Sequence, residues 1–152
     1  MRTVEATAQI ATTRERAIQA FLQLDALRDW WHVDRGLVAP CEGGIWAFAW
    51  ERSEHGFKYV ITGRITALNP ARRLVISDML YFNPERPVLG PMSLTVEAVP
   101  FENGCRLTVR QDVTGEGGDW DWYYKVLNWA WPEVLKELKE YLEHPQGQAH
   151  QA

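Results

Sequence analysis

The sequence predicts a single α+β domain in which a curved antiparallel sheet wraps around a long C-terminal helix. Three features predict this fold class. From Gly43 to about Thr114, apolar and polar residues alternate with the period of two that is typical of half-buried strands. From Asp119 to about Glu143, apolar residues recur with the period of a helix. Only two short helical segments precede the alternating region, so the C-terminal helix must cover the sheet.

The N-terminal segment predicts one strand and two short helices. Residues 4–10 alternate between apolar and polar side chains, which indicates a half-buried strand. Thr12 and Glu15 have the spacing of a capping box, and this spacing predicts a helix over about 13–22. A second short helix is expected over about 25–30.

The alternating region predicts a series of strands joined by turns. We expect these strands over about 45–51, 57–68, 73–81, 92–99 and 105–113. Asn103 and Gly104 carry the signal of a tight hairpin turn. The segment 82–87 contains two prolines, which favours a loop because proline cannot donate to a strand ladder. The resulting order is β-α-α-β-β-β-β-β-α.

The C-terminal helix is expected to begin after Asp119, a suitable N-cap residue. Helical periodicity places one set of residues on its core-facing side: Trp120, Tyr124, Leu127, Trp131, Val134, Leu138 and Tyr141. Pro132 lacks a backbone N–H, which predicts a kink or the start of a second helical segment. The domain should span residues 1–144, and the tail 145–152 is expected to be disordered.

The composition is that of an ordinary globular protein. Of the 152 residues, 46% are hydrophobic and 24% are charged. The net charge of −4, with basic residues scattered among acids, argues against nucleic-acid binding. No apolar run approaches the roughly 18 residues of a membrane span, and the N-terminus lacks a signal peptide. Cys41 and Cys105 indicate free thiols in the cytoplasm, and we expect no metal and no cofactor.

The order of the elements resembles the helix-grip fold of the SRPBCC superfamily, which includes START lipid-transfer domains. Within it, the chain resembles the family named after the activator of Hsp90 ATPase. The residues that carry the resemblance span nearly the whole chain: Trp30-Trp31, Gly43-Gly44, Gly63 with Ile65, Asn69 to Ile76, and Trp131 with Leu135, Leu138, Lys139 and Leu142. The resemblance implies a cavity between helix and sheet.

Two residues depart from the family pattern. Asp78 stands where relatives often have a large apolar or aromatic residue, and Gln111 stands where many have histidine. Both departures indicate a pocket chemistry particular to this chain. No relative's ligand is therefore carried over to it.

An aromatic set is the first candidate for lining a ligand cavity. It comprises Trp46, Phe48, Trp50, Tyr59, Tyr124 and Trp131. Each of these residues alone is better explained by core packing. Together they favour a pocket, because ligand pockets are typically lined by aromatic side chains with few polar groups. The expected ligand is a small hydrophobic or aromatic molecule.

Asp78, Gln111 and Asn128 are the polar candidates. Alternation with Leu74 and Ile76 puts Asp78 on an apolar face, where a carboxylate is costly to bury unless it is paired. It is either a functional group or a residue at the wet end of its strand. Gln111 can both donate to and accept from a ligand, and Asn128 can do likewise or edge the solvent face.

Three functions remain open from the sequence. The favoured one is binding of a small, largely apolar ligand. An enzyme of cyclase, dehydratase or hydrolase type, as polyketide cyclase-like relatives suggest, would use Asp78 as its acid or base. We find no catalytic triad, phosphate loop or metal-ligand set to support it. A chaperone-cofactor or other protein-interaction role rests on the family name alone.

The C-terminal helix carries a second apolar stripe, formed by Trp122, Val126 and Trp129. We expect this stripe to form a homodimer interface, because aromatic residues are favoured in interface cores. Two alternatives remain: the Pro84–Pro91 loop folds over the stripe, or the kink at Pro132 turns it inward.

Overall fold

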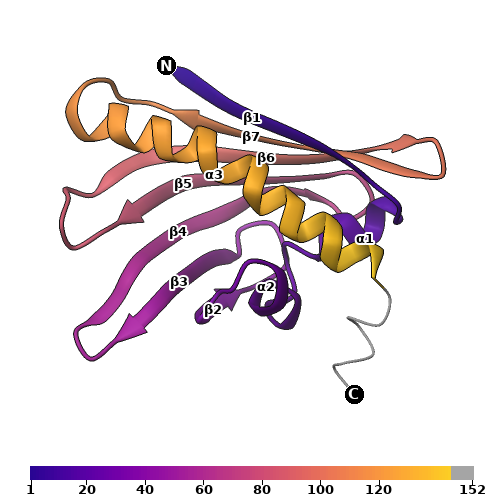
Figure 1. The fold of residues 1–152 in the computed structure, drawn as a ribbon, viewed down its shortest axis with the longest axis horizontal. Helices are drawn as coiled ribbons and strands as arrows, with labels where there is room; N and C mark the ends of the chain where they lie inside the picture. Colours follow the sequence, from indigo (N-terminus) through magenta and orange to yellow (C-terminus); the bar gives the residue numbers. More distant parts are fainter. Residues whose placement is uncertain (145–152) are drawn as a thin grey trace.

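Seven strands form one antiparallel sheet that curves around a long helix (Figure 1). The computed structural model describes residues 1–144, so the predicted disordered tail, 145–152, lies outside the described residues. The elements are β1 (Arg2–Ile10), α1 (Arg14–Gln19), α2 (Leu24–Trp30), β2 (Arg35–Val38), β3 (Ile45–Ser53), β4 (Gly56–Asn69), β5 (Arg73–Phe82), β6 (Leu89–Phe101), β7 (Gly104–Val113) and α3 (Gly118–Glu143). The predicted helix-grip class is confirmed.

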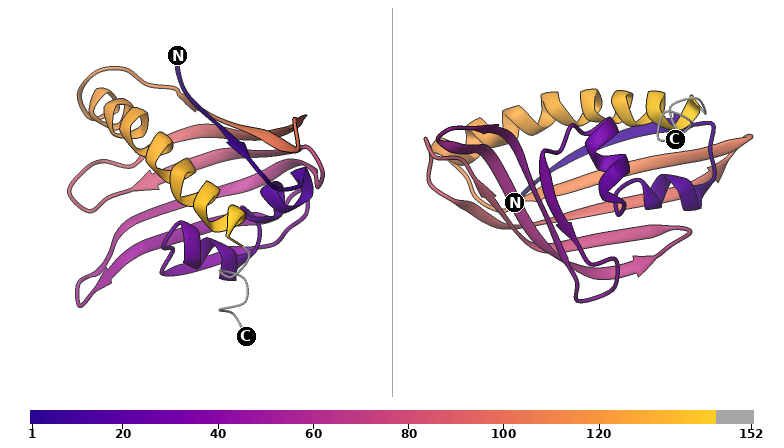
Figure 2. Two further views of the ribbon diagram at one scale, coloured as in Figure 1. Left: turned by 45° about the vertical axis from the view of Figure 1, so that its right-hand side comes forward. Right: turned by 90° about the horizontal axis from the view of Figure 1, so that it is seen from below.

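The strands follow the order β1-β7-β6-β5-β4-β3-β2, so β1 and β2 form the two edges. Figure 2 shows α3 lying across the concave side of the sheet. The helix packs most closely against β1 and also contacts α2. Because α3 lies near one edge of a curved sheet, the middle strands fall away from it, and this leaves room for a pocket.

One strand and two helix starts differ from the sequence prediction. The short strand β2 was not predicted, since its few residues carry no clear alternation. The N-cap of α1 is Thr13, whose hydroxyl accepts from the Arg16 N–H, and not Thr12. The N-cap of α3 is Gly117 with φ of 79°, and the Asp121 carboxylate accepts from its N–H.

Helix α3 runs through Pro132 as one element, so no second helical segment begins there. Pro132 is exposed, and the carbonyl that its missing N–H would engage belongs to Asn128, which is exposed as well. Water can therefore replace the lost helical bond. The buried side of the helix is formed by Tyr123, Leu127, Trp131, Leu135, Leu138 and Leu142, a face rotated from the predicted one.

A bulge in β5 reverses the predicted alternation at Asp78. The register shifts between Ser77 and Leu80 against β4 and between Ile76 and Met79 against β6, so β5 contains one extra residue there. Asp78 occupies the bulge with φ of 55° and points to solvent, while Met79 takes the inward position. The opposite residue is Gly63, where an added Cβ would lie 2.5 Å from Ile76 Cγ2.

Candidate functional site

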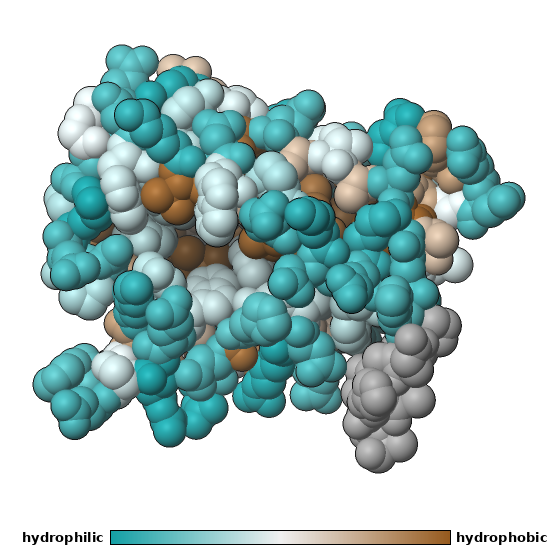
Figure 3. All heavy atoms as spheres, in the orientation of Figure 1, coloured by the Kyte–Doolittle hydropathy of each residue, from teal (hydrophilic) through white to brown (hydrophobic). Residues whose placement is uncertain are grey.

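A pocket of about 510 Å³ lies between α3 and the middle strands. Its aromatic lining consists of Trp31, Trp50, Tyr59, Tyr81, Tyr123, Trp129 and Trp131. Aliphatic side chains from three strands and from α3 complete it, among them Ile61, Met79, Leu94 and Val126. Figure 3 shows a hollow with a hydrophobic floor on this face of the molecule. Its volume is in the range of small-molecule sites.

Trp31 is the centre of the indole part of the lining. Its ring lies 5.2 Å from that of Trp50 and 5.5 Å from that of Trp131, measured between centroids. The Trp50 indole N–H donates to the Trp31 carbonyl at 2.9 Å. Trp31 also stacks on the buried Trp30, with centroids 5.3 Å apart. These contacts fix one side of the pocket before any ligand is present.

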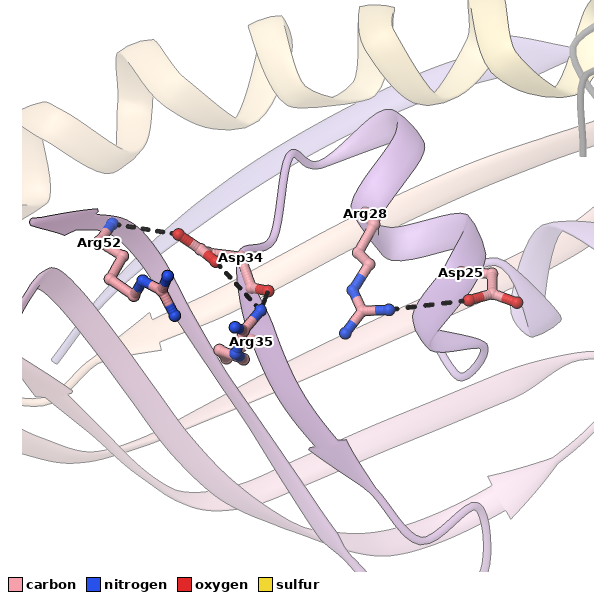
Figure 4. A network of polar contacts seen from close by, with 5 residues as sticks. All are labelled: Asp25, Arg28, Asp34, Arg35 and Arg52. Carbon is pink, nitrogen blue, oxygen red and sulfur yellow. Dashed lines mark hydrogen bonds and ion pairs between the residues drawn. The ribbon is translucent and has the colours of Figure 1, made fainter.

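Asp34 anchors the segment that carries Trp31 (Figure 4). Its N–H donates to the Ala49 carbonyl at 2.9 Å, and its carboxylate accepts from the Arg52 N–H at 3.2 Å. The Arg35 guanidinium lies 3.5 Å from the same carboxylate. Asp34 therefore holds the entry to β2 against β3, and the chain between α2 and β2 keeps Trp31 against the sheet.

Three tyrosines from three elements form the phenol part of the lining. Tyr81 of β5 stacks on Tyr123 of α3 at 4.3 Å and on Tyr59 of β4 at 6.5 Å. The Tyr81 hydroxyl accepts from the Asn83 amide at 3.3 Å. Burial raises the pKa of both Tyr81 and Tyr123, and for Tyr123 a hydrogen bond with Gln111 opposes the shift. The phenols of Tyr81 and Tyr123 are therefore neutral and able to donate at physiological pH.

Gln111 is the buried polar group of the pocket, with 1% of its surface exposed. Its side-chain oxygen accepts from the Trp131 indole N–H at 2.9 Å. Its amide nitrogen faces the Met92 sulfur at 3.7 Å, which is a weak acceptor. The predicted ability of Gln111 to orient a ligand therefore rests on its N–H groups.

His32 and Glu51 are the charged or titratable side chains at the pocket mouth, apart from the phenols. The His32 Nε2 lies 3.8 Å from the Glu137 carboxylate, and the Glu51 carboxylate lies 3.8 Å from the Lys58 ammonium. Both residues have positive φ, 58° and 55°. Non-glycine residues hold such angles only where the surrounding fold requires them.

The structure places two predicted polar residues outside the pocket. Asp78 is exposed and pairs with the Arg64 guanidinium at 2.9 Å, because the β5 bulge turns it outward. Asn128 is exposed, and its amide donates to the Tyr124 carbonyl one turn earlier. Neither residue lines the pocket. A pocket role for Asp78 or Asn128 is therefore wrong.

Three predicted aromatic residues also lie outside the lining. Trp46 and Phe48 are fully buried behind Trp31, and the Trp46 indole donates to the Phe21 carbonyl at 2.8 Å. They pack the core. Tyr124 lies beneath the Arg2 guanidinium, 4.6 Å from it, on the side of α3 away from the pocket. Trp50, Tyr59 and Trp131 do line the pocket, as Gln111 does.

Sequence reasoning missed Trp31, Tyr81 and Tyr123. Trp31 is part of the Trp30-Trp31 pair that carries the family resemblance, so a signal for it existed. Regular alternation predicts that Tyr81 points away from the pocket, but the β5 bulge turns it toward the pocket. Tyr123 was hidden because the first turns of α3 carry aromatic residues on every side, and periodicity cannot choose among them.

The three residues of the stripe predicted as a dimer interface have different surroundings in the structure. Trp122 lies under the Arg86 guanidinium at 3.6 Å, and Arg86 also pairs with Asp119 at 2.8 Å. Val126 lines the pocket. Trp129 alone of the three remains strongly exposed, at 72%. The alternative, in which the loop before β6 covers part of the stripe, applies to Trp122.

Residues 1–144 contain neither a metal-binding group nor a membrane-spanning helix. This part of the chain holds no group of three or more residues with metal-ligating side chains. None of its helices is long and apolar enough to span a membrane. Cys41 is exposed and Cys105 is buried, and neither is in a disulfide.

A family model described as Activator of Hsp90 ATPase homolog 1-like protein matches residues 11–143. No curated protein matches the chain. A protein from Chromobacterium violaceum has a similar structure, with a TM-score of 0.72 and 22% identity over 95% of this chain and 99% of that one. The Aha1 dimer from Colwellia psychrerythraea has a TM-score of 0.72 and 18% identity, and the match covers 94% of this chain and 97% of that one. A Staphylococcus aureus protein has a TM-score of 0.74 and 14% identity, and the match covers 99% of this chain and 96% of that one.

Proposed function

This chain belongs to the family of activator of Hsp90 ATPase homolog 1-like proteins, and we propose that it binds a small, largely apolar molecule in the pocket between α3 and the sheet. The observation that carries the proposal is the pocket itself. It offers about 510 Å³ lined by aromatic and aliphatic side chains around one buried amide. Sites of this composition take up apolar ligands and orient them by a few polar contacts.

Native mass spectrometry of the protein purified from its own host tests the proposal directly. We expect a co-purifying small molecule in the wild type. Ala130 lines the pocket, so Ala130→Phe should fill it and remove the ligand. Lys125→Phe adds the same ring on the exposed side of α3 and serves as the control. Equal occupancy in both variants would contradict the pocket as the site.

The hypothesis of an enzyme that uses Asp78 as its acid or base loses its main support. The carboxylate is exposed and paired with Arg64 outside the pocket. The groups that face the pocket are an amide, an imidazole, phenols and the Glu51 carboxylate at the mouth. We therefore propose binding and assign no reaction.

A chaperone-cofactor role is the second candidate. The family is named for activation of the Hsp90 ATPase, and the exposed Trp129 on α3 is suited to contact a partner protein. The ATPase rate of the host's Hsp90-type chaperone, measured with and without the protein, tests this role. An unchanged rate would reject it. The free, exposed thiol of Cys41 supports a cytoplasmic location.

A further inference from the structure

The charge of the pocket lining restricts what it can hold. No lysine or arginine lines it, and its two charged or titratable mouth residues, His32 and Glu51, already face Glu137 and Lys58. A buried carboxylate or phosphate would therefore find no cationic partner there. Burying an unpaired charge is far more costly than burying a neutral polar group. The lining thus favours an uncharged occupant.

The lining is also built mostly from flat rings. The indole of Trp31 contacts those of Trp50 and Trp131, and the phenols of Tyr59, Tyr81 and Tyr123 form a second group. Both groups line the same pocket. Aromatic rings pair favourably with other rings in stacked or edge-on geometry. A planar aromatic occupant is the best complement to these surfaces.

The buried amide fixes the polar requirement. The Trp131 indole N–H can only donate, so the Gln111 oxygen must face it, and the Gln111 nitrogen must point the other way. That nitrogen lies 3.7 Å from the Met92 sulfur, which is a weak acceptor. A hydrogen bond from this amide opposes the burial that raises the pKa of Tyr123, so the amide donates to the Tyr123 oxygen and leaves the Tyr123 O–H to donate elsewhere. Gln111 and Tyr123 together therefore present N–H and O–H donors to the pocket.

From these observations we infer that the ligand is an uncharged aromatic molecule with a hydrogen-bond acceptor oxygen, such as a ketone, that reaches Gln111 and Tyr123. This inference rests on the proposed function and specifies the class of ligand. The acceptor replaces the weak sulfur contact of Gln111, and the ring occupies the space between the indoles and phenols.

Calorimetric titration with three probes of matched shape tests the inference. The probes are methyl naphthyl ketone, its alkene counterpart isopropenylnaphthalene, and naphthoate. The ketone should bind about two- to twelvefold more tightly than the alkene, since a net hydrogen bond is worth about 0.5–1.5 kcal/mol. Naphthoate should bind more weakly than the ketone. Equal binding of ketone and alkene, or tighter binding of naphthoate, would overturn the inference and leave the pocket proposal standing. If none of the three binds, both fail.

Two variants locate the donors. Tyr123→Phe keeps the ring and should reduce the ratio of ketone affinity to alkene affinity. Gln111→Met should do the same by removing the amide. The matched control is Tyr124→Phe, which removes a hydroxyl from the neighbouring residue outside the pocket. A full ketone advantage in both pocket variants would overturn the assignment of the donors.

Discussion

Trp131 of α3 donates its indole N–H to the side-chain oxygen of Gln111 on β7 at 2.9 Å. Both side chains are buried, with 4% and 1% of their surface exposed. This bond links the helix to the sheet across the floor of the pocket. It also fixes which end of the Gln111 amide a ligand can meet.

We expect Gln111→Leu to lower the free energy of unfolding by about 1–3 kcal/mol, because the Trp131 N–H is left buried without an acceptor. Trp131→Phe should also destabilise, since it orphans the Gln111 oxygen. The double variant should lose less than the two single losses combined, because the shared bond is lost only once. Urea unfolding measures all three, with the exposed Gln9→Leu as control. Strict additivity would show that the bond carries no coupling.

Asp78 is held in the left-handed region by the β5 bulge, not by ligand chemistry. Asp78→Asn should therefore leave stability nearly unchanged, since asparagine tolerates this conformation. Asp78→Val should cost about 1–2 kcal/mol, because a β-branched side chain is strained there. Neither change should alter ligand affinity. Thermal unfolding and titration measure the two effects, and a loss of binding in Asp78→Asn would return this residue to the site.

Glu143 at the end of α3 predicts a pH dependence of stability. Hydrogen bonds from Lys139 and from the Ala11 N–H lower the pKa of its carboxyl below the ordinary value. The carboxylate therefore stabilises the fold above its unfolded-state pKa, and this contribution is lost as pH falls through the lowered folded-state pKa. Glu143→Gln should be less stable than wild type at neutral pH, and the difference should close in acid. Urea unfolding across a pH series measures it, with the exposed Glu140→Gln as control. A difference that is constant with pH would contradict the assignment.

A homodimer through the second stripe of α3 stays a prediction and now depends on Trp129. Trp122 is covered by Arg86 and Val126 lines the pocket, so the single change Trp129→Ser should abolish dimerisation. Sedimentation at micromolar concentration compares it with the wild type and with Lys125→Ser on the same helix. A wild type that sediments as a monomer ends this hypothesis.

Much of the fold could be predicted because periodicity is a local property. The long strands and α3 were found within a few residues, since their alternation extends over many positions. The short strand β2 could not be found, because its pairing with β3 depends on tertiary contacts, including the carboxylate of Asp34.

The site was harder to predict because single-residue shifts decide which side chains face it. The extra residue in β5 exchanges Asp78 for Met79, and nothing in the local sequence marks a bulge there. A rotation of the buried face of α3 exchanges Tyr124 for Tyr123. Gln111 was placed correctly because β7 is regular from end to end and its alternation is not interrupted.

The edge strand β1 has its partner far along the chain: Arg2 lies opposite Val113, and Ile10 lies opposite Cys105. During synthesis on the ribosome, β1 is therefore made first and paired last. The hairpins from β3 to β7 can form in turn as they emerge, but β1 must wait for residues 104–113, and α3 follows immediately afterwards. Closing so large a loop is entropically costly and slows folding. Until then, the nascent chain carries an unpaired strand that chaperones and neighbouring chains can bind.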